Sequence, residues 1–442
     1  MSELPTASSP ATESPSSVAQ EARYPFGKRE IAVGIGNFME WFDFAIYGYF
    51  VAYISATFFP SNNETSATLA AFAVFAVGFF ARPLGAAVLG PLGDRFGRRL
   101  VLMISVLVMG VCTALIGLAP GFDTIGIAAP IIVTVLRFVQ GLSVGGEWTS
   151  SAMFLVESAP NSQRATRASV VSASAALAFI AGTGVALLIN SVLSAEDVAS
   201  WGWRIPFVIS LLLGAVALYI RRNLEETLVF QQLESRRNAG EVIRAPRGAF
   251  WRGFLMAFAI AGIFGVSLYY LVTYMNNYLQ QVAGMETVPA LTVSIIGLVI
   301  YAALNPIAGM VSDRIGRRPM VIVPTVGFAV LGYPLFLMIS TGEFWLVLIA
   351  LIIWAVLQAM IAVMGVVAMV ELFPASIRST GSSLGYNVAY ALLAGPGPFI
   401  ATWLVSSYGP AAPSFYLIAV AVVCGAILIP LMPETRYRNL ND

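Results

Sequence analysis

Twelve long apolar segments alternate with short polar connections along the chain. Six precede a long polar stretch in the middle and six follow it. The segments run over residues 31–59, 66–92, 99–119, 127–157, 165–194, 201–222, 251–282, 287–312, 318–340, 344–373, 377–406 and 413–432. About 20 apolar residues suffice for a helix to cross the hydrocarbon core of a bilayer. The pattern therefore predicts an all-α integral membrane protein with twelve transmembrane helices in two six-helix halves.

The two halves carry the same polar motif between their second and third segments. GPLGDRFGRR at residues 90–99 returns as GMVSDRIGRR at residues 309–318. The matching residues are Gly90, Asp94, Arg95, Gly97, Arg98 and Arg99, with Gly309, Asp313, Arg314, Gly316, Arg317 and Arg318. Such a repeat indicates an internal duplication. Duplicated bundles of membrane helices are typical of secondary transporters, whose site lies between the halves.

Polar segments mark the expected domain boundaries. The first residues are rich in Ser, Pro, Ala, Thr and Glu and lack the apolar region of a signal peptide, which favours a disordered cytoplasmic tail. We expect the central polar stretch to lie along the cytoplasmic face as a short helix. The predicted units are the tail 1–27, the first half 28–222, the linker 223–250, the second half 251–433 and a short cytoplasmic tail 434–442.

Arginine and lysine residues predict the orientation of these helices. All of them fall in the two tails or at the even-numbered connections except Arg82 and Arg137, which lie within spans, and Arg204, at the mouth of the sixth span. Positive charge stays on the cytoplasmic side of a membrane, so both termini are expected there. We therefore expect a multi-pass protein of the plasma membrane of a bacterium.

Composition excludes several classes of function. Hydrophobic residues make up 58% of the chain and the net charge is +1, so no strong field points to nucleic acid. Histidine is absent, and Cys112 and Cys424 both lie in apolar runs. These features predict no metal or other cofactor and argue against a membrane-embedded enzyme, which needs metal ligands or a nucleophile with its base. Proton transfer would then fall to carboxylates.

Charged residues inside membrane helices are costly and therefore point to function. All the candidates belong to the first half: Glu40, Asp43, Arg82, Arg137 and Glu147. Glu40, Asp43 and Tyr47 share one face of the first helix because they are three and seven residues apart.

The fourth segment carries a second polar stripe, made of Arg137, Gln140, Val144, Glu147 and Ser151. A structural network that ties helices 1, 2 and 4 together is the alternative interpretation. We favour function, because an apolar core would avoid the cost of burying charges. A carboxylate beside an arginine can exchange its proton when a substrate competes for that arginine.

The second half has no such charges and offers aromatic and amide side chains instead. The candidates for substrate binding are Tyr270, Tyr274, Asn277, Trp354, Gln358, Asn387 and Tyr390. Aromatic stripes more often serve packing. As a group facing the charged half, they are expected to form walls of a central cavity, since ring faces attract ammonium groups.

The repeated loop is expected to form a conformational latch. Its aspartates can form ion pairs and cap nearby helices. Glu157 and Glu371 occupy matching contexts, ESAPNSQR (157–164) and ELFPASIR (371–378), and join this candidate latch. The alternative is that the arginines only fix topology, which leaves the repeated Gly and Asp spacing unexplained.

Several motifs resemble those of a known family. The repeated loop and RFVQG (137–141) are similar to motifs of the major facilitator superfamily. The combination of GNFMEWFDF (36–44), RPLG (82–85), QGLSVGGEW (140–148) and WGWRIPF (201–207) resembles its metabolite:proton symporter family, which includes proline/betaine, α-ketoglutarate, citrate and shikimate permeases. The resemblance implies that Glu40, Asp43, Arg137 and Glu147 belong to the coupling and binding centre.

These observations favour proton-driven uptake of a small metabolite that bears a carboxylate, by a protein that functions as a monomer. The proton would be carried by Glu40, Asp43 or Glu147. Arg137 and Arg82 would meet the substrate carboxylate, with Tyr47 and Gln140 nearby. A zwitterion such as proline or glycine betaine is favoured. A mono-, di- or tricarboxylate is the alternative, and a transporter-like receptor or channel is a third possibility.

Overall fold

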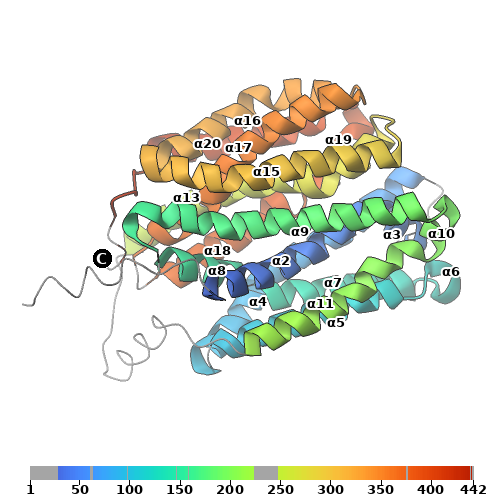
Figure 1. The fold of residues 1–442 in the computed structure, drawn as a ribbon, viewed down its shortest axis with the longest axis horizontal. Coiled ribbons are helices and arrows are strands. Elements are labelled where there is room, and N and C mark those ends of the chain that lie inside the picture. The colour runs from blue at the N-terminus through green and yellow to red at the C-terminus, as the bar shows by residue number, and fades with distance from the viewer. Residues whose placement is uncertain are drawn as a thin grey trace, which may run out of the picture.

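Helices form the whole described secondary structure of the computed structural model (Figure 1). The structure describes residues 28–59, 63–96, 98–145, 147–157, 159–222, 247–374, 377–438 and 440. For some of these residues, including 28–32, 90–96, 98–102 and 147, only the backbone is described. The tail 1–27 and most of the linker predicted at 223–250 lie outside the described residues.

The helices of the first half follow one another with short connections. The bounds are α2 (Lys28–Tyr49), α3 (Val51–Phe58), α4 (Glu64–Phe96), α5 (Arg98–Leu118), α6 (Phe122–Ile125), α7 (Ala128–Val144), α8 (Glu147–Glu157), η1 (Asn161–Gln163), α9 (Arg164–Val192), α10 (Ala195–Ser200), η2 (Gly202–Arg204) and α11 (Ile205–Arg222).

The second half repeats the plan with two π-helical turns, η3 and η4. The bounds are α13 (Arg247–Tyr269), η3 (Tyr270–Tyr274), α14 (Met275–Gln281), α15 (Thr287–Ile315), α16 (Arg317–Ile339), α17 (Phe344–Glu371), α18 (Arg378–Ala389), η4 (Tyr390–Ala394), α19 (Gly397–Tyr408) and α20 (Pro413–Leu431). Helix α13 begins four residues before the boundary that the sequence predicts.

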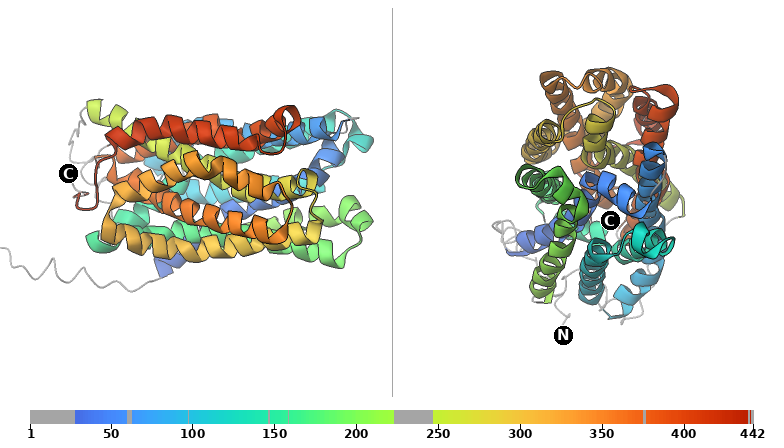
Figure 2. Two further views of the ribbon diagram at one scale, coloured as in Figure 1. Left: turned by 90° about the horizontal axis from the view of Figure 1, so that it is seen from above. Right: turned by 90° about the vertical axis from the view of Figure 1, so that its right-hand side faces the viewer.

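The predicted all-α membrane fold is confirmed. Eight described helices are long and apolar enough to cross a bilayer. Shorter apolar helices occupy three more of the predicted segments, at Met103–Leu118, Ala128–Val144 and Gly202–Val216. Figure 2 shows the two bundles side by side, with their helices roughly parallel.

Four predicted spans are not continuous α-helices. The first breaks at Phe50, the fourth between Val144 and Glu147, and the seventh and eleventh contain η3 and η4. Gly145 follows the last residue of α7, and glycine disfavours helix. The predicted stripe of the fourth span assumed one continuous helix, and beyond Val144 it stays a prediction.

Glycines let helices pack backbone to backbone at two places. Between α4 and α7, a methyl group on Gly141 would lie 1.9 Å from the carbonyl oxygen of Gly78. Between the halves, α15 lies along α9, and a methyl group on Gly309 would lie 2.7 Å from the carbonyl oxygen of Ala165. Small residues are typical of such close contacts in membrane bundles. The second contact draws the two halves together at the cytoplasmic end.

Candidate functional site

A buried ion pair lies where the first half meets the second. Arg82 of α4 approaches Glu40 of α2, with Nη2 3.5 Å from Oε1. Both side chains are at most 2% exposed. The sequence placed these residues at similar depths, and the structure brings them together. A guanidinium and a carboxylate in contact can each exchange their partner for a charged group of a solute.

Aromatic rings from both halves enclose this pair. The Arg82 guanidinium lies 4.8 Å from the ring centre of Phe44, 4.7 Å from that of Phe79 and 5.9 Å from that of Tyr390. Tyr390 opens η4, so the second half closes over the arginine. Tyr269, the last residue of α13, packs against Phe79 with ring centres 5.0 Å apart. The pair is therefore held in an aromatic enclosure rather than in water.

Three phenol groups of this enclosure lack partners. The hydroxyls of Tyr269, Tyr386 and Tyr390 are buried and make no hydrogen bond among the described residues, and the same holds for Nε of Arg82. Tyr386 stacks on Tyr390 at 4.1 Å and on Trp148 at 4.3 Å between ring centres. Buried phenols normally find a hydrogen-bond partner. The enclosure therefore contains buried polar groups that make no hydrogen bond among the described residues.

A second polar cluster lies inside the first half. Thr113 of α5 donates to Oδ2 of Asp43 at 2.9 Å and accepts from Nε2 of Gln140 at 2.6 Å. Nη1 of Arg137 donates to Oε1 of Gln140 at 3.2 Å. The Arg137 guanidinium also lies 3.7 Å from the ring centre of Tyr47. The sequence grouped four of these residues and missed Thr113, which no motif marks.

Phenylalanine rings separate the two clusters. The Arg137 guanidinium lies 5.9 Å from the ring centre of Phe44, the ring that Arg82 approaches from its own cluster. It also lies 5.8 Å from the ring centre of Phe75, and that ring packs edge-on against Tyr269. Arg82 therefore faces the second half, whereas Arg137 is set back within the first.

Several second-half candidates point away from these charges. Tyr270 donates to the carbonyl of Pro413 and packs near Trp354, within the second half. Trp354 and Gln358 donate to backbone carbonyls of α13. The expectation that these three side chains face the charged half is therefore wrong. The wall that does so is made of Tyr269, Tyr386 and Tyr390, of which the sequence singled out the last.

The other second-half candidates contact the first half or lie near it. Tyr274 packs against Phe72 of α4, with ring centres 6.3 Å apart, and Asn277 is buried on the next turn. Asn387 donates to the carbonyl oxygen of Gly145 at 2.8 Å. That carbonyl ends α7 at the break in the fourth span, so Asn387 bridges the halves there. The side chain of Glu147 lies outside the described residues.

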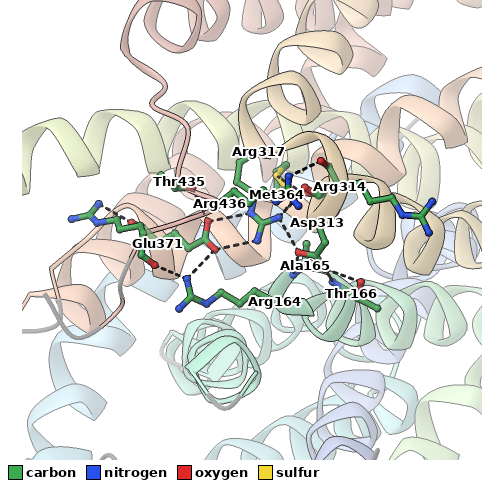
Figure 3. A network of polar contacts seen from close by, with 12 residues as sticks. Arg164, Ala165, Thr166, Asp313, Arg314, Arg317, Met364, Glu371, Thr435 and Arg436 are labelled. Atoms are coloured by element: carbon green, nitrogen blue, oxygen red, sulfur yellow. Dashed lines mark hydrogen bonds and ion pairs between the residues drawn. The ribbon is translucent and has the colours of Figure 1, made fainter. Parts of the chain in front are cut away.

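The second copy of the repeated motif joins the halves at the cytoplasmic end (Figure 3). Asp313 of α15 accepts hydrogen bonds from the backbone N–H groups of Ala165 and Thr166 at 3.1 and 2.8 Å, and from the Thr166 hydroxyl at 2.7 Å. A carboxylate of the second half thus caps the N-terminus of α9 in the first. Arg317 donates to the same carboxylate at 3.0 Å.

Glu371 and Glu157 complete the contacts at this end. Glu371 is fully buried, pairs with Arg317 at 3.3 Å and lies 3.8 Å from Arg164 of the first half. Glu157 of the first half pairs with Arg378 of the second at 2.8 Å. These contacts join the two halves at the cytoplasmic end.

The remaining members of the predicted latch divide into two groups. The side chains of Arg314 and Arg318 are exposed. The contacts of the first copy lie outside the described part of the structure; its residues are Gly90, Asp94, Arg95, Gly97, Arg98 and Arg99.

The segment after α20 crosses the same end. Glu434 accepts hydrogen bonds from the backbone N–H groups of Arg317 and Arg318, at the start of α16, and from that of Arg436. Partial burial raises the pKa of Glu434, but these donors outweigh it and lower the pKa below its ordinary value. Arg164 donates to the carbonyl of Arg438 at 2.7 Å. The segment therefore bridges both halves.

The halves also meet on the outer side of the ion pair. A methyl group on Gly48 of α2 would lie 2.9 Å from Cα of Thr273 in η3. The aromatic enclosure is therefore closed on both sides, which corresponds to an occluded arrangement.

Known proteins resemble the chain in both sequence and fold. The family model "Sugar (and other) transporter" matches residues 30–249, and "Major Facilitator Superfamily" matches residues 290–441. A proline/betaine transporter of Escherichia coli is 37% identical over 421 residues, covering 92% of this chain and 84% of that protein. A glycine betaine/proline/ectoine/pipecolic acid transporter of Dickeya dadantii is 35% identical, covering 92% of this chain and 83% of that protein.

Two solved structures share the fold. A D-xylose-proton symporter superposes with a TM-score of 0.72 at 20% identity, covering 92% of this chain and 98% of that one. A xylose transporter from Escherichia coli, in a partially occluded inward-open conformation, gives 0.75 at 18% identity, with 93% and 99% covered.

Proposed function

Because this chain belongs to the major facilitator superfamily and is related over most of its length to proline/betaine transporters, we propose that it imports proline or glycine betaine together with protons. The observation that carries the proposal is the Glu40–Arg82 pair under an aromatic enclosure contributed by both halves. The protein is a multi-pass membrane transporter, and we place it in the bacterial plasma membrane as a functional monomer.

A zwitterion fits the chemistry of this enclosure. The guanidinium of Arg82 can bind the substrate carboxylate through parallel hydrogen bonds. The ammonium group would lie against the rings of Tyr269 and Tyr390, because aromatic faces attract cations, and near the carboxylate of Glu40. The unpartnered phenol hydroxyls can bind the remaining carboxylate lone pairs.

Dianions and trianions fit less well. They would need a second cation at the enclosure, and Arg137 lies behind the rings of Phe44 and Phe75 with partners of its own. This arrangement favours a zwitterion over α-ketoglutarate or citrate. Arg137 then serves the proton site instead of binding the substrate carboxylate directly.

We assign proton transfer to Asp43. It is buried beside Arg137 through a hydrogen-bonded chain and lies one helical turn from Glu40. Substrate binding at Arg82 and protonation of Asp43 would then act on the same helix, α2. Glu40 and Glu147 remain the alternative carriers. The cytoplasmic contacts of Asp313, Glu371 and Arg378 would break as the halves rock to open inward.

Flux measurements in proteoliposomes test this function. An imposed pH gradient, acidic outside, should drive saturable accumulation of labelled proline and glycine betaine but not of α-ketoglutarate or citrate. Arg82→Lys should raise KM at least tenfold, since one ammonium cannot reproduce the bidentate contact. Arg252→Lys is the matched control, because Arg252 is exposed.

Uptake measurements can contradict the proposal in several ways. Uptake that ignores the pH gradient, or that fails to saturate as in a channel, excludes proton symport. Full gradient-driven uptake by both Asp43→Asn and Glu147→Gln removes the assignment of the proton to these carboxylates. Saturable, gradient-driven uptake of a dicarboxylate instead would favour the alternative substrate class.

A further inference from the structure

Thr113 links the candidate proton carrier to the fourth helix. It lies on α5 and is 1% exposed. Its hydroxyl stands between Asp43 of α2 and Gln140 of α7, at 2.9 and 2.6 Å. The chain of contacts from Asp43 through Thr113 and Gln140 to Arg137 thus ties three helices together.

The direction of every hydrogen bond in this chain follows from Arg137. A guanidinium can only donate, so Gln140 must present its oxygen to Arg137. Its amide nitrogen therefore faces Thr113 and donates to that hydroxyl. The hydroxyl hydrogen is then left for Asp43. All the hydrogens point toward the carboxylate, which is the arrangement that suits its ionised form.

Protonation of Asp43 weakens this link without reversing it. A hydrogen bond to an ionised acceptor is roughly twice as strong as one between neutral groups. When the carboxylate gains a proton, the bond from Thr113 loses that charge assistance. The contact of Arg137 with the Tyr47 ring, at 3.7 Å, then remains as the second tie between α7 and α2.

The surroundings of Asp43 contain few other charges. Among the described residues, the titratable or charged groups near it are Glu40 and Tyr47 on α2, Arg137 on α7 and the Cys112 thiol on α5. A small cavity between α2, α5 and α11 adjoins Asp43 and is lined by the Ser210 hydroxyl as well.

We propose that Thr113 is a positioning residue for proton coupling, which holds ionised Asp43 in register with Gln140 and Arg137 and holds it less tightly once Asp43 is protonated. The proposal rests on the proton-coupled uptake proposed above and adds the residue that transmits the charge of Asp43 to α7. Thr113 acts through Asp43. Among the described residues, no hydrogen bond joins Thr113 to the aromatic enclosure.

The test replaces the hydroxyl and keeps the shape. Thr113→Val removes the donor, and Thr113→Ser restores it. Thr183→Val is the matched control, because Thr183 is equally buried in the first half but its hydroxyl binds a carbonyl of its own helix at 2.8 Å. Each variant is reconstituted, and gradient-driven accumulation of proline is compared with proline counterflow, which needs no net proton movement.

Thr113→Val should accumulate about tenfold less proline while its counterflow stays within about twofold of the parent rate. Its uptake should also reach half-maximum at a pH about one unit higher, because the ionised carboxylate has lost a donor. Thr113→Ser should restore both values. If the valine variant also loses counterflow, Thr113→Cys, with its weaker donor, takes its place and should show the same split.

The proposal fails if the valine or cysteine variant accumulates proline as the parent does, or if serine gives no rescue. A parent protein that shows no gradient-driven uptake overturns the proposed function instead, so the two failures are distinguishable.

Discussion

Asp313→Asn should open the cytoplasmic side of this protein. The Asp313 carboxylate accepts four hydrogen bonds, three from Ala165 and Thr166 at the start of α9 and one from Arg317. Asparagine keeps the shape but offers one oxygen and one NH₂ group. At least one backbone N–H of α9 is then left facing a donor.

The size of the shift toward the open arrangement can be worked out from these contacts. An unpartnered buried donor costs about 1–3 kcal/mol. Loss of negative charge at a helix N-terminus adds about 0.3–1 kcal/mol. A total near 2 kcal/mol corresponds to roughly a 30-fold shift in the equilibrium toward the cytoplasm-open arrangement. The equilibrium shifts toward opening because Asp313 and α9 belong to opposite halves, so the weakened hydrogen bonds are ones that join the halves.

Thiol accessibility measures this shift. The native Cys112 and Cys424 are both buried, so a single reporter, Ser383→Cys, can be placed at the contact with Gly145 between the halves. Labelling by an impermeant maleimide from the cytoplasmic side should be roughly 30-fold faster in the Asp313→Asn background. Asp123→Asn, on the opposite side of the membrane, is the control.

An unchanged labelling rate in Asp313→Asn would show that this carboxylate does not hold the halves closed. Equal acceleration by Asp123→Asn would show a general loss of stability instead.

Three further predictions concern other parts of the molecule. Tyr390→Phe should raise KM for proline about fivefold, because the hydroxyl proposed to bind the substrate carboxylate is lost, whereas Tyr333→Phe at the surface should leave uptake kinetics unchanged. Because the pKa of Glu434 is lowered, its carboxylate stabilises the folded protein fully above the ordinary glutamate pKa, and this stabilisation is lost only as the pH falls through the lowered pKa. Hydrogen-exchange protection at the start of α16 should therefore hold at neutral pH and disappear in Glu434→Gln. Gly141→Ala should destabilise the protein by about 1–3 kcal/mol in thermal unfolding, and Gly248→Ala, where no atom lies within 4 Å, should not; equal melting temperatures would contradict the packing argument.

The membrane fold could be predicted from the sequence because span length and charge asymmetry are local properties. Apolar segments of sufficient length must form helices in a bilayer, since no water satisfies their backbone groups. The repeated Asp and Arg spacing also pointed to the cytoplasmic contacts that Asp313 and Arg317 make. The breaks were harder to see, because the helical pattern continues on both sides of the glycines at 145 and 146.

The aromatic wall shows why the candidate site was only partly predictable. Periodicity singled out Tyr270, yet its neighbour Tyr269 faces Arg82 and Glu40. Three consecutive aromatic or apolar positions satisfy several helical faces equally well, and the π-turn that follows changes the register of the faces. The side that meets the first half is therefore set by the packing of α13 against α18 and η4.

The sequence alone determined that the chain spans a membrane in two related halves and that the charges within its membrane spans belong to the first. Hydropathy, charge position and the repeat are properties of single segments and need no partner. Only the tertiary structure separated those charges into a Glu40–Arg82 pair between the halves and an Asp43–Arg137 cluster behind it. Which charges meet depends on the packing of α2 against α4, α5 and α7, and Thr113 gains its role solely from that packing.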